Sequence, residues 1–95
     1  MTNLMIPQIS QEECAEVIQA ISKVLRFGLH QCHPKTGKSN KESLEEEIGQ
    51  LKYMLERLVV EYGLDMSNVW DAYYDKGDAL EHWAAFYQTE PKAEV

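Results

Sequence analysis

Apolar residues recur along most of the chain at intervals of three and four, which is the spacing of an amphipathic helix. The first stretch covers residues 11–27. Ser10 followed by Glu13 is a capping-box pattern placed after Pro7, and Gly28 marks the end of the stretch. The pattern predicts a first helix over residues 11–27.

A second helix is predicted after a loop rich in turn-forming residues over positions 29–39. Either Ser39 with Glu42 or Asn40 with Ser43 can open this helix, and Gly63 is a typical C-terminal cap.

The last third of the chain predicts two shorter helices. Ser67 can cap a helix over 68–76, Gly77 marks a bend or break, and residues 78–87 form the last helix. The sequence shows no strand-like alternation. We therefore expect an all-α fold, a bundle of about four helices forming one domain over residues 1–95 with short flexible termini.

One glutamate interrupts the apolar stripe of the second predicted helix. Leu51, Met54 and Leu58 all project within about 40° of Glu47 on a helical wheel. An isolated ionised carboxylate on a core-facing stripe is costly, so it needs a cation or hydrogen-bond donors nearby.

The first predicted helix repeats this arrangement. Glu13 lies in the stripe of Val17, Ala20 and Val24, and Glu16 lies at its edge. If the two helices pack antiparallel, these two carboxylates face Glu47 and form a hard-oxygen site suited to Mg²⁺ or Mn²⁺. The competing interpretation is that glutamate-rich helices simply present a solvated face.

Composition limits the range of functions. The chain has 95 residues, 16 acidic and 9 basic, and a formal net charge of −7. No basic stripe is present, which argues against a general nucleic-acid backbone binder. We find no apolar run long enough to span a membrane and no signal-peptide pattern, so we expect a cytoplasmic protein without a membrane partner. Cys14 and Cys32 lie on different predicted elements and are expected as reduced thiols.

Three segments resemble the small MazG-like members of the all-α nucleoside triphosphate pyrophosphohydrolases: EECAE at 12–16, SKVLRFG at 22–28 and SNKESLEEEIG at 39–49. The resemblance implies a helical bundle, assembly as a homo-oligomer (a dimer or tetramer), and Mg²⁺-dependent hydrolysis of a nucleoside triphosphate to monophosphate and pyrophosphate. It also implies that Glu13, Glu16 and Glu47 are the catalytic metal ligands.

Gln50 departs from the family pattern, which has an aspartate at this fourth ligand position. A glutamine carbonyl can coordinate a hard cation but adds no negative charge. The chain is therefore either a weak or retuned enzyme, or a catalytically silent nucleotide-binding or helical interaction module. Asp71, Asp75 and Asp78 could in principle replace the missing charge, although a solvated helical face is the better explanation for them.

Further side chains suit a nucleotide substrate. Lys23 lies two turns from Glu16 on the same side of the helix, and Arg26 is less well placed. Asn40 and Lys41, at the start of the second helix, can combine side-chain donors with helix N-terminal amides to hold phosphates. Phe27 can stack on a base.

Two other groups carry alternative hypotheses. His30, Cys32 and His33 cluster in the loop and suggest a zinc site, but a fourth ligand is missing. Trp70, Tyr73 and Trp83 provide enough apolar area for an interface between chains.

Overall fold

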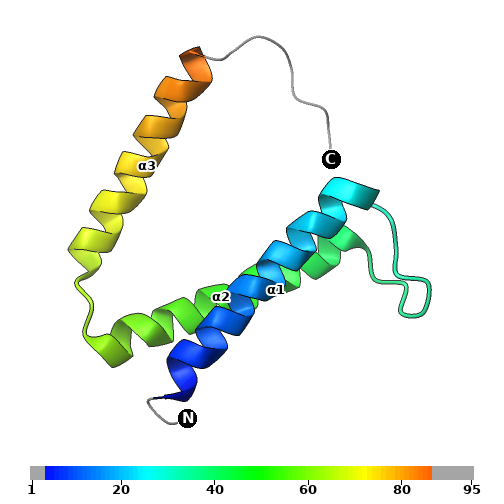
Figure 1. Cartoon of the computed structure of the whole chain (residues 1–95), viewed down its shortest axis with the longest axis horizontal. Helices are drawn as coiled ribbons and strands as arrows, with labels where there is room; N and C mark the ends of the chain where they lie inside the picture. Colours follow the sequence, from blue (N-terminus) through cyan, green and yellow to red (C-terminus); the bar gives the residue numbers. More distant parts are fainter. Residues whose placement is uncertain (1–3, 87–95) are drawn as a thin grey trace.

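The structure, a computed structural model, describes residues 4–86 and contains three helices: α1 (Met5–Phe27), α2 (Asn40–Tyr62) and α3 (Met66–Phe86) (Figure 1). In these residues the β pairing is limited to one isolated bridge between Cys32 and Ser39 in the loop. The all-α prediction is confirmed. The expected flexible termini lie outside the described residues.

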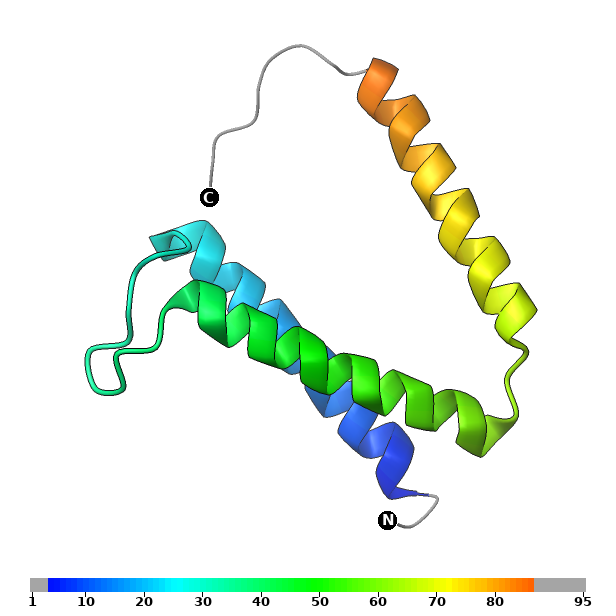
Figure 2. The same ribbon diagram turned by 180° about the vertical axis from the view of Figure 1, so that it is seen from behind.

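α1 and α2 pack against each other as an antiparallel hairpin, and both ribbon views show them crossing side by side (Figures 1 and 2). The hairpin has a thin core. The buried apolar side chains are Ile6, Ala20 and Val24 of α1 and Met54 of α2. Their positions follow from the spacing of three and four residues, which places one row of apolar side chains from each helix at the contact between α1 and α2.

α1 begins earlier than the sequence pattern predicts. Pro7 lies in its first turn, where the missing N–H has no helical partner to lose. Ser10 is an interior, buried residue whose hydroxyl donates to the carbonyl of Ile6 at 2.7 Å and approaches that of Met54 at 3.4 Å. The predicted capping role of Ser10 with Glu13 is therefore wrong, because the helix continues through both residues.

α2 has the predicted ends. Ser39 Oγ accepts a hydrogen bond from the Glu42 amide at 3.0 Å, and Glu42 Oε1 accepts one from the Ser39 amide at 3.1 Å. Gly63 closes the helix in the left-handed region, with φ of 59°. The capping box and the glycine cap are confirmed.

α3 is one continuous helix where two were predicted. Gly77 lies inside it, because the cost of about 1 kcal/mol for a helical glycine is too small to break a favourable 21-residue helix. Asp65 takes the capping role predicted for Ser67, since its Oδ1 accepts from the Ser67 amide at 2.8 Å and the Ser67 hydroxyl at 2.7 Å. The described residues thus contain three helices rather than about four.

α3 stands apart from the hairpin, and its side chains over residues 66–84 are exposed. The molecule is flat, with principal extents of 43 × 41 × 14 Å. Within residues 4–86, no helix is both long enough and apolar enough to cross a membrane.

Candidate metal and phosphate site

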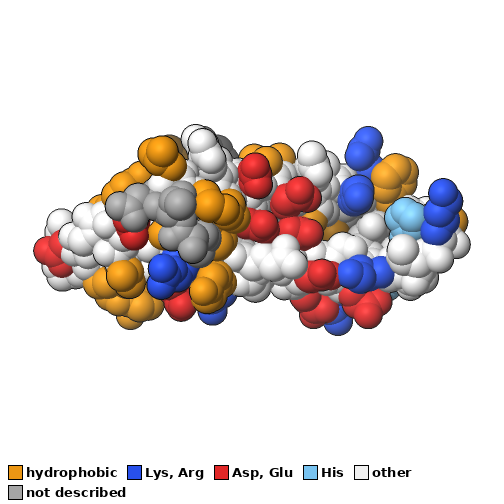
Figure 3. All heavy atoms as spheres, turned by 90° about the horizontal axis from the view of Figure 1, so that it is seen from below, with side chains coloured by type: hydrophobic (Ala, Val, Ile, Leu, Met, Phe, Trp, Pro, Cys, Tyr) orange, Lys and Arg blue, Asp and Glu red, His pale blue; other side chains and the backbone are white. Residues whose placement is uncertain are grey.

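The carboxylates predicted as ligands lie on one side of the hairpin. Glu13 of α1 and Glu47 of α2 are half-buried between the helices, and Glu16 is exposed one turn along α1. In the view of Figure 3, acidic side chains gather near the middle of the molecule. The half-buried positions follow from the place of each glutamate within its apolar row.

The pKa of Glu47 shows that these groups interact. Burial raises the pKa of this carboxyl, and the negative charges of Glu16, Glu13 and Glu46 raise it further, while Lys38 lowers it. Since Glu13 and Glu16 belong to the other helix, the fold brings together charges from distant parts of the sequence.

Gln50 lies between the two half-buried carboxylates. With its amide oriented to match its surroundings, the nitrogen donates to Glu13 Oε2 at 3.2 Å and to Glu47 Oε2 at 3.3 Å. A single neutral side chain thus supplies hydrogen-bond donors to both helices. Asp71, Asp75 and Asp78 are exposed on α3, which does not pack against the hairpin.

The donor set fits Mg²⁺ or Mn²⁺ in its chemistry, since carboxylate and amide oxygens are the ligands that hard cations prefer. Its arrangement is not that of an assembled centre. Among residues 4–86, no group of three or more His, Cys, Asp or Glu side chains is arranged to hold a metal ion. Carboxylates without a cation repel one another, and the Gln50 amide occupies the position between two of them.

A hollow of about 490 Å³ opens beside the carboxylates and is shared by the two helices. Ile9 and Glu13 line it from α1, and Glu46, Gln50 and Tyr53 line it from α2. Its volume is in the range of small-molecule sites.

A second hollow, of about 410 Å³, lies where the loop joins the two helices. It brings together Lys23, Phe27 and Asn40, three of the five predicted substrate-binding residues, with Lys38 and His33. The Asn40 side-chain nitrogen already donates to the Gly28 carbonyl at 3.0 Å, so this amide also holds the loop in place.

The two remaining predicted substrate residues do not line this hollow. The Arg26 guanidinium lies 5.1 Å from the centre of the Phe27 ring. Lys41 is exposed, and its backbone amide donates to the Leu29 carbonyl at 2.9 Å. The Asn40 backbone N–H donates to the Gln31 carbonyl at 3.0 Å, so neither backbone N–H is directed at a phosphate in this conformation.

Lys38 is a site residue that the sequence reasoning missed. It forms an ion pair with Glu46, and this hydrogen bond and charge raise the pKa of the Lys38 ammonium. Lys38 lies just before the Ser39 cap, outside α2, so helical spacing alone does not predict its contact with Glu46 two turns along that helix.

Two of the loop side chains considered as zinc ligands form hydrogen bonds within the loop. Cys32 Sγ donates to the His30 carbonyl at 3.6 Å, and His33 Nδ1 accepts from the Lys35 amide at 3.1 Å. In the part of the chain that the structure describes, these residues form no set of metal ligands. Both cysteines are free thiols, as predicted.

Comparison of the chain with protein-family models, with curated proteins and with solved structures gives no match. The resemblance to MazG-like proteins therefore stays a prediction, supported by the three sequence segments alone.

Proposed function

We propose that the protein is an Mg²⁺-dependent nucleotide pyrophosphohydrolase of the MazG-like type, which converts a nucleoside triphosphate to a monophosphate and pyrophosphate. The observation that supports it best is the electrostatic contact of Glu47 with Glu13 and Glu16 across the two helices. The negative charges that raise the pKa of Glu47 are an unfavourable arrangement that a divalent cation relieves.

Each group has a role in this proposal. Glu13, Glu16 and Glu47 would hold the metal, with the Gln50 carbonyl as a weaker ligand if its amide turned over. A bound Mg²⁺ would supply charge neutralisation for the phosphates and would lower the pKa of the attacking water. Lys23 and Lys38 lie in the neighbouring hollow, where their charges can hold phosphate oxygens.

The position of the two hollows suits a nucleotide. Lys38 lines the hollow beside the loop and forms an ion pair with Glu46, which lines the hollow beside the carboxylates. A ligand with its base near Phe27 and its phosphates directed toward the carboxylates would therefore pass along one side of the hairpin. Arg26 beside the Phe27 ring adds a cation near that end.

The test is pyrophosphate release from a panel of nucleoside triphosphates under saturating Mg²⁺. We expect Glu47→Gln and Glu13→Gln to lower turnover at least tenfold, or about 1.4 kcal/mol of transition-state stabilisation. Glu12→Gln is the matched control, because Glu12 is exposed and adjacent to Glu13 but is not among the charges that raise the pKa of Glu47.

Release that is insensitive to Mg²⁺, or an equal loss in the Glu12 and Glu47 variants, would contradict the proposed role of the carboxylates. No pyrophosphate from any triphosphate would contradict the enzymatic function.

A second candidate is a catalytically silent module that binds nucleotide or a helical partner. The hydrogen bonds from Gln50 to Glu13 and Glu47 favour it, because they give one oxygen of each carboxylate a donor without metal. Calorimetric titration with a non-hydrolysable triphosphate analogue distinguishes the two, since nucleotide binding without turnover of the natural triphosphate supports the silent module.

A further inference from the structure

The loop between α1 and α2 contains a turn that one histidine holds closed. His33 donates its backbone N–H to the Lys38 carbonyl at 2.8 Å, and its own carbonyl accepts from the Gly37 N–H at 2.9 Å. Its ring nitrogen Nδ1 accepts from the Lys35 N–H at 3.1 Å and from the Thr36 N–H at 3.4 Å. The backbone and the ring of this residue therefore act together on the turn.

The same turn fixes the backbone of Lys38. The Lys38 N–H donates to Thr36 Oγ1 at 3.2 Å, and the Lys38 carbonyl accepts from His33. Gly37, with φ of 75°, adopts the left-handed conformation that lets the chain turn back. The next residue is the cap of α2. Because both of its backbone groups are held, Lys38 is placed where its ammonium reaches Glu46 of α2.

The ring of His33 accepts these hydrogen bonds only while Nδ1 carries no proton. A neutral imidazole has one donor nitrogen and one acceptor nitrogen, so the two backbone donors assign the proton to Nε2. A second proton would place an N–H group against the backbone N–H groups of Lys35 and Thr36, and both hydrogen bonds would be lost. Histidine is the side chain that ordinarily changes its charge between pH 5 and 8.

The surroundings of His33 offer a protonated ring no replacement partner that would keep the turn in shape. His33 lines the hollow of about 410 Å³ beside the loop. The described side chains that line it and can carry charge are Lys23 of α1 and Cys32 and Lys38 of the loop, and α2 contributes uncharged side chains. Lys35, within the turn, is a further cation. A protonated ring therefore meets other cations and a thiol rather than a carboxylate.

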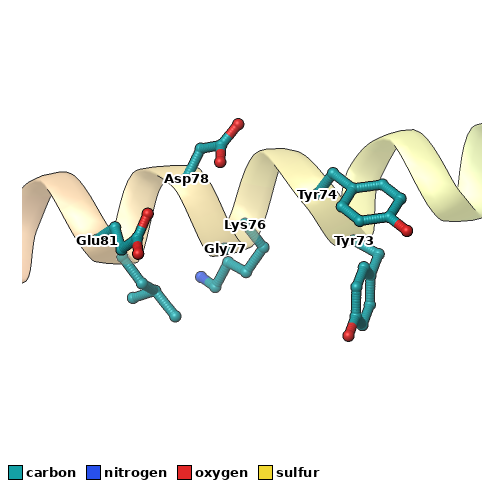
Figure 4. A pocket seen from close by; sticks show the side chains of 7 residues that line it. Tyr73, Tyr74, Lys76, Gly77, Asp78 and Glu81 are labelled. Carbon is teal, nitrogen blue, oxygen red and sulfur yellow. The ribbon is translucent and has the colours of Figure 1, made fainter.

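The hollow beside the loop depends on this turn because separate elements form it. A larger hollow, of about 600 Å³, lies along α3, and Figure 4 shows Tyr73, Tyr74 and Glu81 projecting beside it from that one helix. The hollow beside the loop is instead lined from α1, the loop and α2. Its shape and the position of its lysines therefore change if the turn opens.

We propose that His33 is a positioning residue for Lys38 and that its protonation is a pH switch. The neutral ring holds the turn and places Lys38 beside α2, and the protonated ring releases both. The consequence for phosphate binding rests on the proposed function, in which Lys38 holds phosphate oxygens, whereas the coupling of His33 to Lys38 does not.

The first experiment measures the turn in the full chain without nucleotide. Nitrogen-15 spectra of the imidazole should show the Nε2–H form of His33 at pH 7.5. The backbone N–H groups of Lys35, Thr36 and Lys38 should lose about tenfold or more of their protection from hydrogen exchange between pH 7.5 and pH 5.5, after correction for the intrinsic rate at each pH. Equal protection at both pH values, or the Nδ1–H form at pH 7.5, would overturn the proposal.

Substitutions separate the acceptor on the ring from its charge. Asn carries a side-chain oxygen that accepts from N–H groups further along a turn and takes no proton, and Asn before proline favours a turn. His33→Asn should therefore keep the protection at both pH values, whereas His33→Ala should lose it at pH 7.5. His30→Asn is the matched control, because His30 contributes its backbone carbonyl to the loop, as the acceptor for Cys32, and this variant should respond to pH as the wild type does. Loss of protection by His33→Asn on acidification would show that another group is the switch.

A second experiment follows the consequence for Lys38. Calorimetric titration with inorganic tripolyphosphate and Mg²⁺ compares the wild type with His33→Asn at one pH, so that protonation of the probe affects both equally. We expect equal affinities at pH 7.5 and about fivefold or weaker binding by the wild type at pH 5.5, and Lys38→Met should abolish this difference. Equal affinities at pH 5.5, or tighter binding by the wild type, would overturn the action through Lys38. Absence of binding by every variant would contradict the proposed function, and the hydrogen-exchange result would still decide whether His33 holds the turn.

Discussion

Restoring a carboxylate at position 50 changes the balance of charge at the centre of the site. In Gln50→Asp the amide that donates to Glu13 at 3.2 Å and to Glu47 at 3.3 Å is replaced by a third negative charge between the two. The variant recreates the glutamate and aspartate spacing of the family pattern.

Two effects determine how much Gln50→Asp lowers the free energy of unfolding when no metal is bound. The two lost hydrogen bonds are long and partly exposed, so we assign about 0.5 kcal/mol to each. A like charge about 4 Å from a carboxylate costs about 1 kcal/mol in water, less at moderate salt. We expect the free energy of unfolding at pH 7 to fall by about 1–2 kcal/mol, which is about 4–16 °C in melting temperature for a domain of this size.

Mg²⁺ should reverse this cost, because a cation bound by the folded state alone stabilises it by about 1.4 kcal/mol at ten times its dissociation constant. The assay is thermal unfolding with and without Mg²⁺, at one protein concentration, for the wild type, Gln50→Asp and Gln50→Ala. The alanine variant separates lost hydrogen bonds from added charge and should gain no recovery from Mg²⁺ beyond that of the wild type.

The same variant should raise pyrophosphate release about tenfold or more, equivalent to about 1.4 kcal/mol at the transition state. If Gln50→Asp melts at the wild-type temperature with and without Mg²⁺, the carboxylates do not form a shared site. If the wild type is already fast and Gln50→Asp slows it, Gln50 belongs to a retuned native site.

Two further predictions concern single side chains. Because its neighbours and burial raise the pKa of Glu47, the wild type loses stability as pH rises from the unfolded pKa of about 4.3 through the higher folded value. Glu47→Gln should therefore match the wild type in stability near pH 4, be more stable at pH 7 and lose Mg²⁺ binding. Urea unfolding at both pH values measures the stability, and calorimetry measures the Mg²⁺ binding. A loss of helix at pH 7 would show that Glu47 is structural. Ser39→Ala removes the cap of α2 and should lower stability by about 1 kcal/mol in urea unfolding, whereas Ser43→Ala, inside the helix, should change it little; equal effects would refute the capping role.

The sequence by itself determined the helical class, the ends of α2 and the placement of two glutamates among apolar residues. These are local properties: a cap depends on residues three positions apart, and an apolar row depends on a fixed rotation per residue. The start of α1 and the continuity of α3 were predicted wrongly for a related reason. Ser10 has a capping pattern but lies within reach of Met54, and Gly77 has a breaking tendency that the rest of α3 outweighs.

Only the tertiary structure decided how the charges are compensated. No sequence spacing shows that the Gln50 amide lies between Glu13 and Glu47, or that Lys38 returns from the loop to Glu46, because each contact depends on how α1, the loop and α2 pack. The same packing separates the two sides of the hairpin. It brings the carboxylates together on one side and leaves Ile18, Ile21 and Leu25 exposed on the other, because an antiparallel pair aligns one row of each helix and turns the flanking rows to opposite sides.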